Sequence, residues 1–162
     1  MKVLLATSKP FASQAVNGIQ NVIESAGYTF EKLENYSEKS QLLDALIDVD
    51  ALIVRSDIID AEIINNAPNL KIIVRAGAGY DNVNILAAEE RGICVMNTPG
   101  QNANAVAELV YGMMIYVQRN QFDGSVGREL KNRRLGLYAF GNVAKKVARI
   151  ARGFNMAIYA FS

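Results

Sequence analysis

Five short apolar runs recur in the first hundred residues, and they limit the folds open to this chain more than any other feature. The runs cover residues 3–6, 28–33, 51–54, 71–74 and 93–96. Each is short, mostly β-branched or aliphatic, and bounded by polar or turn residues. Continuous apolar runs of this length are typical of parallel strands that are buried on both faces of a sheet.

The segments between these runs have helical spacing. In residues 15–26 the apolar side chains recur three or four positions apart, and Gly27 follows as a stop. Shorter helices are expected over 41–47, 61–66 and 84–90. Strands that alternate with helices predict a doubly wound α/β unit, and we expect the flavodoxin-like strand order 2-1-3-4-5.

The alternation of short apolar runs and helical segments is interrupted after the fifth run. Pro99 and Gly100 interrupt it, Asn102 or Asn104 is placed to cap a helix over 105–119, and a polar loop follows over 120–133. The remainder reads as strand 135–138, glycine turn, helix 143–151 and strand 156–161. We therefore expect two domains: a flavodoxin-like portion over 1–101 and, over 102–162, the start of a Rossmann nucleotide-binding domain.

The turn before the second predicted helix has dinucleotide-binding spacing. The three glycine positions of that fingerprint are occupied by Ala139, Gly141 and Ala144. The central glycine lets backbone approach a pyrophosphate, and alanine is acceptable at the third position. Alanine at the first position is a departure, which costs roughly 1–2 kcal/mol if the turn needs a positive φ. By itself the motif is equally compatible with an ordinary strand-to-helix turn.

Composition narrows the function classes. With 17 Lys and Arg against 16 Asp and Glu, the net charge of +1 gives no reason to expect a nucleic-acid or membrane partner. The single cysteine, Cys94, cannot form an internal disulfide, and the cytoplasm is the expected compartment. The sequence contains no histidine, so the commonest general base near neutral pH is missing. No metal site is expected.

Five motifs, in this order, resemble the D-2-hydroxyacid dehydrogenases, and within them the short-form D-3-phosphoglycerate dehydrogenases. They are Val54-Arg-Ser, Val74-Arg-Ala-Gly-Ala-Gly-Tyr-Asp-Asn, Val95-Met-Asn-Thr-Pro-Gly-Gln-Asn, Ala107-Glu-Leu and Gly127-Arg-Glu-Leu. The resemblance covers the whole chain but only about the first half of such an enzyme. It implies an NAD-dependent oxidoreductase that acts on the CH–OH group of a 2-hydroxy acid, here 3-phosphoglycerate in serine biosynthesis.

The resemblance also implies a set of site residues. Substrate would be met by Arg55, Arg75, Ala76 and Gly77, with backbone N–H groups available as far as Gly79. Cofactor would be met by Ala78, Gly141, Asn142, Val143 and Ser162. Serine stands at position 162 where an NAD enzyme usually has aspartate, so NADP is not excluded. A salt bridge is the alternative role for each arginine, and a structural turn is the alternative for the glycine-rich loop.

The catalytic residues of the family are a histidine, a carboxylate and an arginine in its C-terminal half, so no residue of this chain is predicted to be catalytic. We expect a truncated chain that is inactive alone, with three origins open: a fragment, a degenerate paralogue, or a chain completed by a partner. The expected partners are an acidic small molecule and a second subunit, either in a homodimer or as a full-length chain. A non-catalytic binding or oligomerisation fragment is the alternative function.

Overall fold

The structure, a computed structural model, describes residues 1–161 and divides into two compact units. The first comprises Met1–Pro99, and the second comprises the described residues from Gly100 onward. The division lies two residues before the expected domain boundary. The assignment of the two units to a substrate portion and a nucleotide-binding portion stays a prediction.

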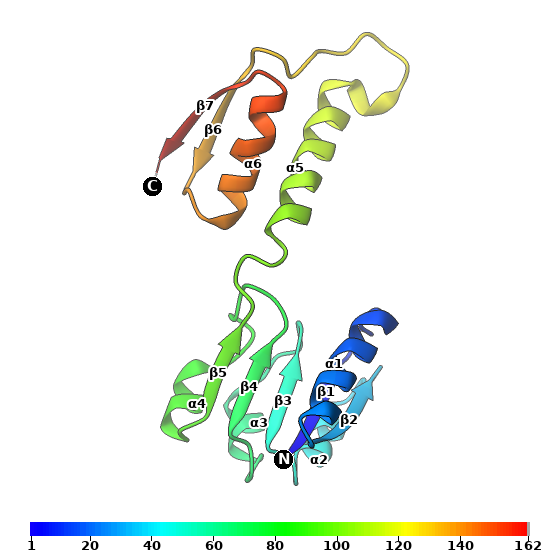
Figure 1. Ribbon diagram of the computed structural model, residues 1–162, viewed down its shortest axis with the longest axis vertical. Coiled ribbons are helices and arrows are strands. Elements are labelled where there is room, and N and C mark those ends of the chain that lie inside the picture. The colour runs from blue at the N-terminus through cyan, green and yellow to red at the C-terminus, as the bar shows by residue number, and fades with distance from the viewer. Residues whose placement is uncertain (162) are drawn as a thin grey trace. The chain divides into compact units, whose positions relative to one another are not determined.

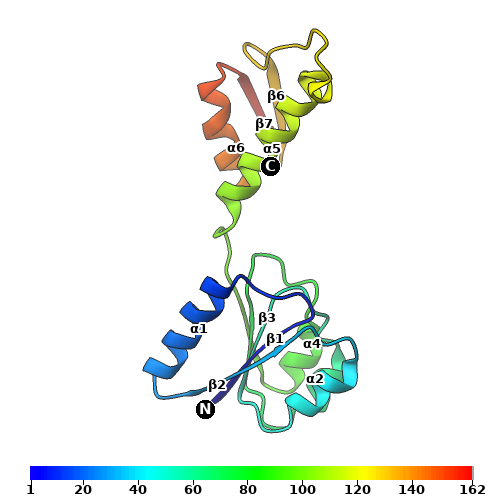
Figure 2. The same cartoon turned by 90° about the vertical axis from the view of Figure 1, so that its right-hand side faces the viewer.

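The first unit is a five-stranded parallel sheet with helices between its strands (Figure 1). Its elements are β1 (Lys2–Thr7), α1 (Ser13–Ser25), β2 (Thr29–Glu34), α2 (Lys39–Ala45), β3 (Ala51–Val54), α3 (Ala61–Asn65), β4 (Ile72–Arg75), α4 (Ile85–Glu90) and β5 (Cys94–Asn97). The strand order is β2-β1-β3-β4-β5, which confirms the predicted order. Figure 2 shows α1 on one face of the sheet and α2 and α4 on the other.

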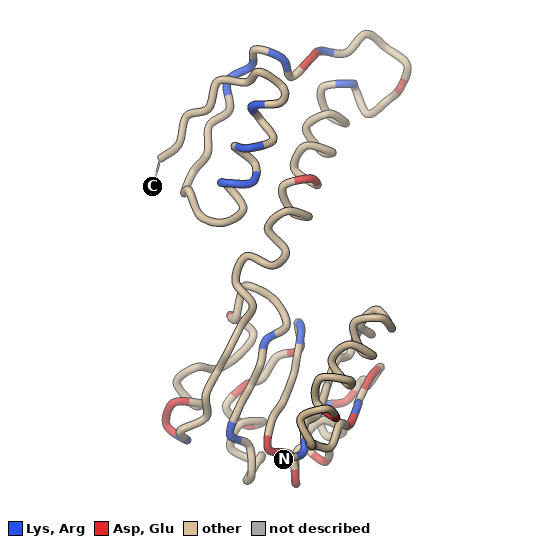
Figure 3. The backbone as a smooth tube through the Cα atoms, viewed as in Figure 1, with Lys and Arg blue, Asp and Glu red and all other residues tan. Residues whose placement is uncertain are grey.

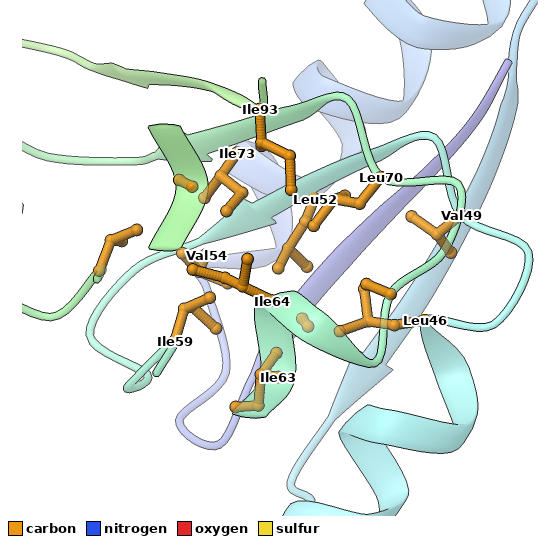
Figure 4. Packing of buried hydrophobic residues seen from close by; sticks show 14 of the residues in the cluster. Leu46, Val49, Leu52, Val54, Ile59, Ile63, Ile64, Leu70, Ile73 and Ile93 are labelled. Atoms are coloured by element: carbon orange, nitrogen blue, oxygen red, sulfur yellow. The ribbon is translucent and has the colours of Figure 1, made fainter. Parts of the chain in front are cut away.

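Both faces of the central strands are buried, as the continuous apolar runs predict. On the side of α2, α3 and α4, the strand residues Leu52, Val54 and Ile73 pack against Ile63 and Ile64 (Figure 4). A smaller cluster covers the α1 face and contains Val3, Ile23 and Ala51. The double burial fixes the sheet rigidly, so the residues that follow its strands are held in defined places.

The second unit contains α5 (Ala103–Gln118), the short 3-10 helix η1 (Asn120–Phe122), β6 (Arg134–Tyr138), α6 (Asn142–Gly153) and β7 (Ala157–Phe161). The strands β6 and β7 pair in parallel, which confirms the predicted strand, turn, helix and strand. The two long helices pack through Ala107 and Tyr111 of α5 and Val147 of α6. The Tyr111 hydroxyl donates to the Val147 carbonyl at 2.8 Å, so this buried polar group is satisfied.

Helix α5 differs in two respects from its prediction. The spacing of apolar residues in the helix predicted over 105–119 places Leu109, Met113 and Val117 on its buried face, but these three side chains are exposed. The buried face is instead centred on Ala107 and Tyr111, which belong to the cluster that includes Val147 of α6. The helix is apolar on more than one side, and periodicity alone does not decide which side is covered.

The predicted cap of α5 is confirmed in position, since Asn102 is the N-cap residue, but not in its hydrogen bond. Asn102 occupies the cap position, but its side chain makes no capping hydrogen bond. Asn104 lies inside the helix and donates to the Glu108 carboxylate. Within residues 1–161 no helix is long and apolar enough to cross a membrane.

Candidate functional site

The carboxyl ends of three neighbouring strands bring the predicted substrate residues together. The register pairs Val54 at the end of β3 with Arg75 at the end of β4, and pairs Arg75 with Asn97 at the end of β5. Arg55 follows Val54 directly. Parallel α/β sheets bind ligands outside the carboxyl ends of their strands, so this edge is the expected place for a substrate.

The two arginines are free to meet an anion. Arg55 is exposed and Arg75 is partly buried, and neither forms an ion pair within residues 1–161. The Arg75 guanidinium lies over Gly77, in the space that a Cβ on Gly77 would fill, and the buried Nε of Arg75 has no hydrogen-bond partner in the described part of the chain. Figure 3 shows basic positions at the ends of both β3 and β4. A guanidinium suits carboxylate and phosphate ligands.

The loop that follows Arg75 uses part of its backbone internally. The Ala76 N–H donates to the Val54 carbonyl at 2.7 Å, and the Gly77 N–H donates to the Arg75 carbonyl at 2.8 Å. The N–H groups of Ala78 and Gly79 have no acceptor among the described residues. Of the four expected backbone donors, two are therefore engaged within the protein and two are available to a ligand.

A buried carboxylate near this edge was not predicted from the sequence. Asp57 is only 7% exposed, and its Oδ1 accepts hydrogen bonds from the Ser8 N–H at 2.6 Å and the Tyr36 hydroxyl at 2.7 Å. Burial acts to raise the pKa of Asp57, but these hydrogen bonds outweigh it and hold the pKa below its ordinary value. Burial, with the hydrogen bond to Asp57 added, raises the pKa of Tyr36, so Tyr36 stays protonated at neutral pH. The carboxylate ties together the loops after β1, β2 and β3.

Cavity size does not mark the substrate edge. A cavity of about 570 Å³ lies along β5, and its lining includes Tyr80 and Asn97 but neither Arg55 nor Arg75. Among residues 1–161 there is no group of three or more His, Cys, Asp and Glu side chains that could hold a metal ion. The site is therefore defined by its charges and free backbone donors.

The turn before α6 has the parts of an anion site. Gly141 is the N-cap residue, and a Cβ placed on it would meet no heavy atom of residues 1–161 within 4 Å. The first intrahelical bond runs from the Lys145 N–H to the Gly141 carbonyl at 3.0 Å, so the N–H groups of Asn142 and Val143 are free. Ala139 has φ of 68°, the left-handed conformation that glycine adopts most easily. These residues fit the pyrophosphate of a dinucleotide at a helix N-terminus.

The surroundings of this turn favour an anion. The first turn of α6 has no acidic residue, and Lys145, Lys146 and Arg149 are exposed on the helix (Figure 3). The side-chain amide of Asn142 lies against Gly100, with Nδ2 3.0 Å from the position of a Cβ on that glycine. The remaining cofactor candidate, position 162, lies outside the described residues, so its predicted contact with a ribose has no structural account.

Comparisons with known proteins agree with this arrangement. The profile of the family described as "D-isomer specific 2-hydroxyacid dehydrogenase, catalytic domain" matches residues 5–160. The crystal structure of NAD⁺-bound 3-phosphoglycerate dehydrogenase from Entamoeba histolytica superimposes with a TM-score of 0.95 and 49% sequence identity, covering 100% of this chain and 54% of that one.

Two curated relatives match most of this chain. Hydroxypyruvate reductase of Thermotoga maritima is 40% identical over an alignment of 145 positions, which covers 81% of this chain and 47% of the relative. Human D-3-phosphoglycerate dehydrogenase is 34% identical over an alignment of 151 positions, which covers 85% of this chain and 28% of the relative. The chain thus spans about half the length of the first relative and about a quarter of the second. The protein belongs to the D-isomer-specific 2-hydroxyacid dehydrogenase family.

Proposed function

We propose that this chain supplies the substrate- and cofactor-binding parts of an NAD-dependent oxidoreductase that acts on the CH–OH group of 3-phosphoglycerate, a step in serine biosynthesis. The observation that carries the proposal is the pair of arginines at one sheet edge, next to two free backbone N–H groups. Guanidinium groups attract a phosphorylated acid, and oriented N–H groups bind a carboxylate. The likeness to the Entamoeba enzyme supports this choice among the 2-hydroxy acids.

The cofactor in this proposal is NAD, which when bound accepts the hydride from the substrate carbon. Gly141 leaves the end of α6 open to a pyrophosphate, and the free N–H groups of Asn142 and Val143 donate to it. The positive end of the helix dipole adds to this attraction. Because the acid that usually selects against a 2′-phosphate is replaced by serine, discrimination against NADP is expected to be weak.

No residue of this chain is proposed as the general base. The sequence has no histidine, and Lys145 and Lys146 are exposed on α6 like an ordinary solvated face. A base must lie within hydrogen-bond reach of the hydroxyl proton that it removes. We therefore expect the 162-residue chain by itself to bind its ligands without turnover.

The test is a titration of the purified chain with NADH and NADPH, followed by cofactor fluorescence, with and without 3-phosphoglycerate. We expect saturable NADH binding that Gly141→Val removes. Absorbance at the nicotinamide band monitors turnover. An absence of dinucleotide binding would overturn the cofactor assignment, and steady turnover would overturn the expectation that the chain is inactive alone.

A second candidate is a non-catalytic association module, and one observation favours it. One face of the β6–β7 sheet packs on the helices, while the other carries Tyr138, Tyr159 and Phe161, which are 88%, 62% and 69% exposed. Exposed apolar faces of this kind mark association surfaces. The expected partner is a second copy or a full-length subunit. Sedimentation velocity of the chain and of Tyr159→Thr distinguishes the two candidates, because only an association module loses its self-association in the variant.

A further inference from the structure

Asn97 is the last residue of β5, and it and its neighbour hold two consecutive carbonyls of the loop after β4. The Asn97 side-chain amide donates from Nδ2 to the Ala78 carbonyl at 2.7 Å. The backbone N–H of Thr98 donates to the Gly77 carbonyl at 2.8 Å. Both carbonyls therefore point toward the end of β5.

The direction of these carbonyls decides the direction of the next two N–H groups. In a trans peptide unit the C=O and the N–H point in opposite directions, and the described residues contain no cis peptide bond. The Gly77 carbonyl shares its peptide unit with the Ala78 N–H, and the Ala78 carbonyl shares its unit with the Gly79 N–H. Both N–H groups consequently point away from β5. Successive N–H groups that face the same way form an anion-binding concavity.

We infer that Asn97 is a positioning residue for the carboxylate of the substrate. Its amide fixes the Ala78–Gly79 peptide so that the Gly79 N–H, together with the Ala78 N–H, faces the ligand. The inference rests on the proposed function, which assigns an acidic substrate to this edge. The role that we infer for Asn97 is indirect: its Nδ2 donates to the Ala78 carbonyl, and the backbone N–H groups of Ala78 and Gly79 meet the ligand.

Charged groups of both signs lie near the loop, so the fixed orientation of the Ala78 and Gly79 N–H groups matters for where a carboxylate binds. Arg75 lies over Gly77, and Arg55 follows β3 on the other side of β4. A negative group is also close: the Asp81 Oδ1 lies 3.0 Å from the position of a Cβ on Gly79. A carboxylate therefore approaches arginines and an aspartate on the same edge, and fixed N–H donors determine where it can sit.

The experiment is a titration of the ¹⁵N-labelled 162-residue chain with glycolate, the smallest 2-hydroxy acid, followed by NMR. Ethylene glycol, which lacks the charge, is the matched ligand control. We expect glycolate to shift the amide signals of Ala78 and Gly79, and we expect Asn97→Asp, which keeps the shape but removes the donor, to weaken binding by about five- to tenfold.

Asn69→Leu is the control variant, because the Asn69 amide makes the same kind of bond, to the Ile47 carbonyl at 3.2 Å, before β4 begins. It should leave glycolate affinity unchanged. Asn97→Leu repeats the test without a new charge, and signals from the rest of the first unit report whether each variant folds. Equal glycolate shifts in the parent and both Asn97 variants would overturn the inference alone. Absence of these shifts in the parent would overturn the proposed substrate site and the inference with it.

Discussion

Ala139 has a left-handed backbone conformation that is unfavourable for a residue with a Cβ, and this predicts how a glycine at the same position changes stability. Ala139 lies between β6 and the N-cap of α6 with φ of 68°. Its N–H donates to the Phe161 carbonyl at 2.7 Å, so the conformation is held by the end of the β6–β7 ladder. The residue is exposed, and its methyl group contributes no core packing.

Replacing Ala139 by glycine removes the steric opposition and loses little else. An L-residue in the left-handed region costs roughly 1–2 kcal/mol relative to the right-handed one. Glycine also destabilises the folded state by about 0.4–1 kcal/mol, because an unfolded chain with glycine at this position has more conformational entropy to lose on folding. The difference predicts that Ala139→Gly stabilises the second unit by about 0.5–1 kcal/mol.

Amide hydrogen exchange across α6 measures this change within the second unit. The predicted gain slows exchange through opening of the unit by about two- to fivefold. Ala160→Gly is the matched control, because Ala160 is also exposed but lies inside β7. There glycine should destabilise by roughly 0.5–1 kcal/mol. If both variants destabilise the unit equally, the reasoning from the positive φ is wrong.

Three further predictions concern the two candidate sites. Gly141→Val should reduce NADH affinity at least tenfold in a fluorescence titration, because its side chain would occupy the space through which a pyrophosphate approaches the N-terminus of α6. Arg75→Gln should weaken 3-phosphoglycerate binding by about five- to tenfold in calorimetry and should make the binding affinity less dependent on salt concentration. Equal salt dependence in the variant and the parent would contradict this prediction. Tyr36→Phe should cost roughly 1.5–3 kcal/mol in urea unfolding at pH 7. Because the pKa of Asp57 is lowered in the folded protein, its carboxylate stabilises the fold at pH values above its unfolded-state pKa of about 3.9. This stabilisation is lost as the pH falls through the folded-state pKa of Asp57. Tyr36→Phe raises that folded-state pKa, so the variant should lose stability at a higher pH than the parent.

Much of the fold could be predicted from the sequence, because the patterns that indicate strands and helices are local. Five apolar runs predict five strands, and the strand order is confirmed. The positions of Arg55 and Arg75 were also readable, since residues that follow parallel strands meet at one edge. In such cases periodicity and topology suffice, and no side-chain detail is needed.

The parts that were missed depend on which neighbour a side chain meets. Asp57 is one of 16 acidic residues, and the residues next to it in the sequence do not indicate that Ser8 and Tyr36 donate hydrogen bonds to its carboxylate. Leu109 and Tyr111 are both apolar positions of α5, yet only contact with α6 decides which is buried. The sequence likewise could not reveal that two of four expected backbone donors are already used inside the loop.

Two different effects act on an anion at the substrate edge, and they differ in what they can select. An exposed guanidinium such as that of Arg55 attracts any anion, and its reach is limited by screening to roughly 8 Å at physiological salt. The N–H groups of Ala78 and Gly79 act only at hydrogen-bond distance and only along fixed directions. Loss of an arginine should therefore slow association and reduce salt dependence, whereas loss of the Asn97 amide should speed dissociation at any salt. Selection of a carboxylate over other anions must come from the second effect, because charge alone does not distinguish them.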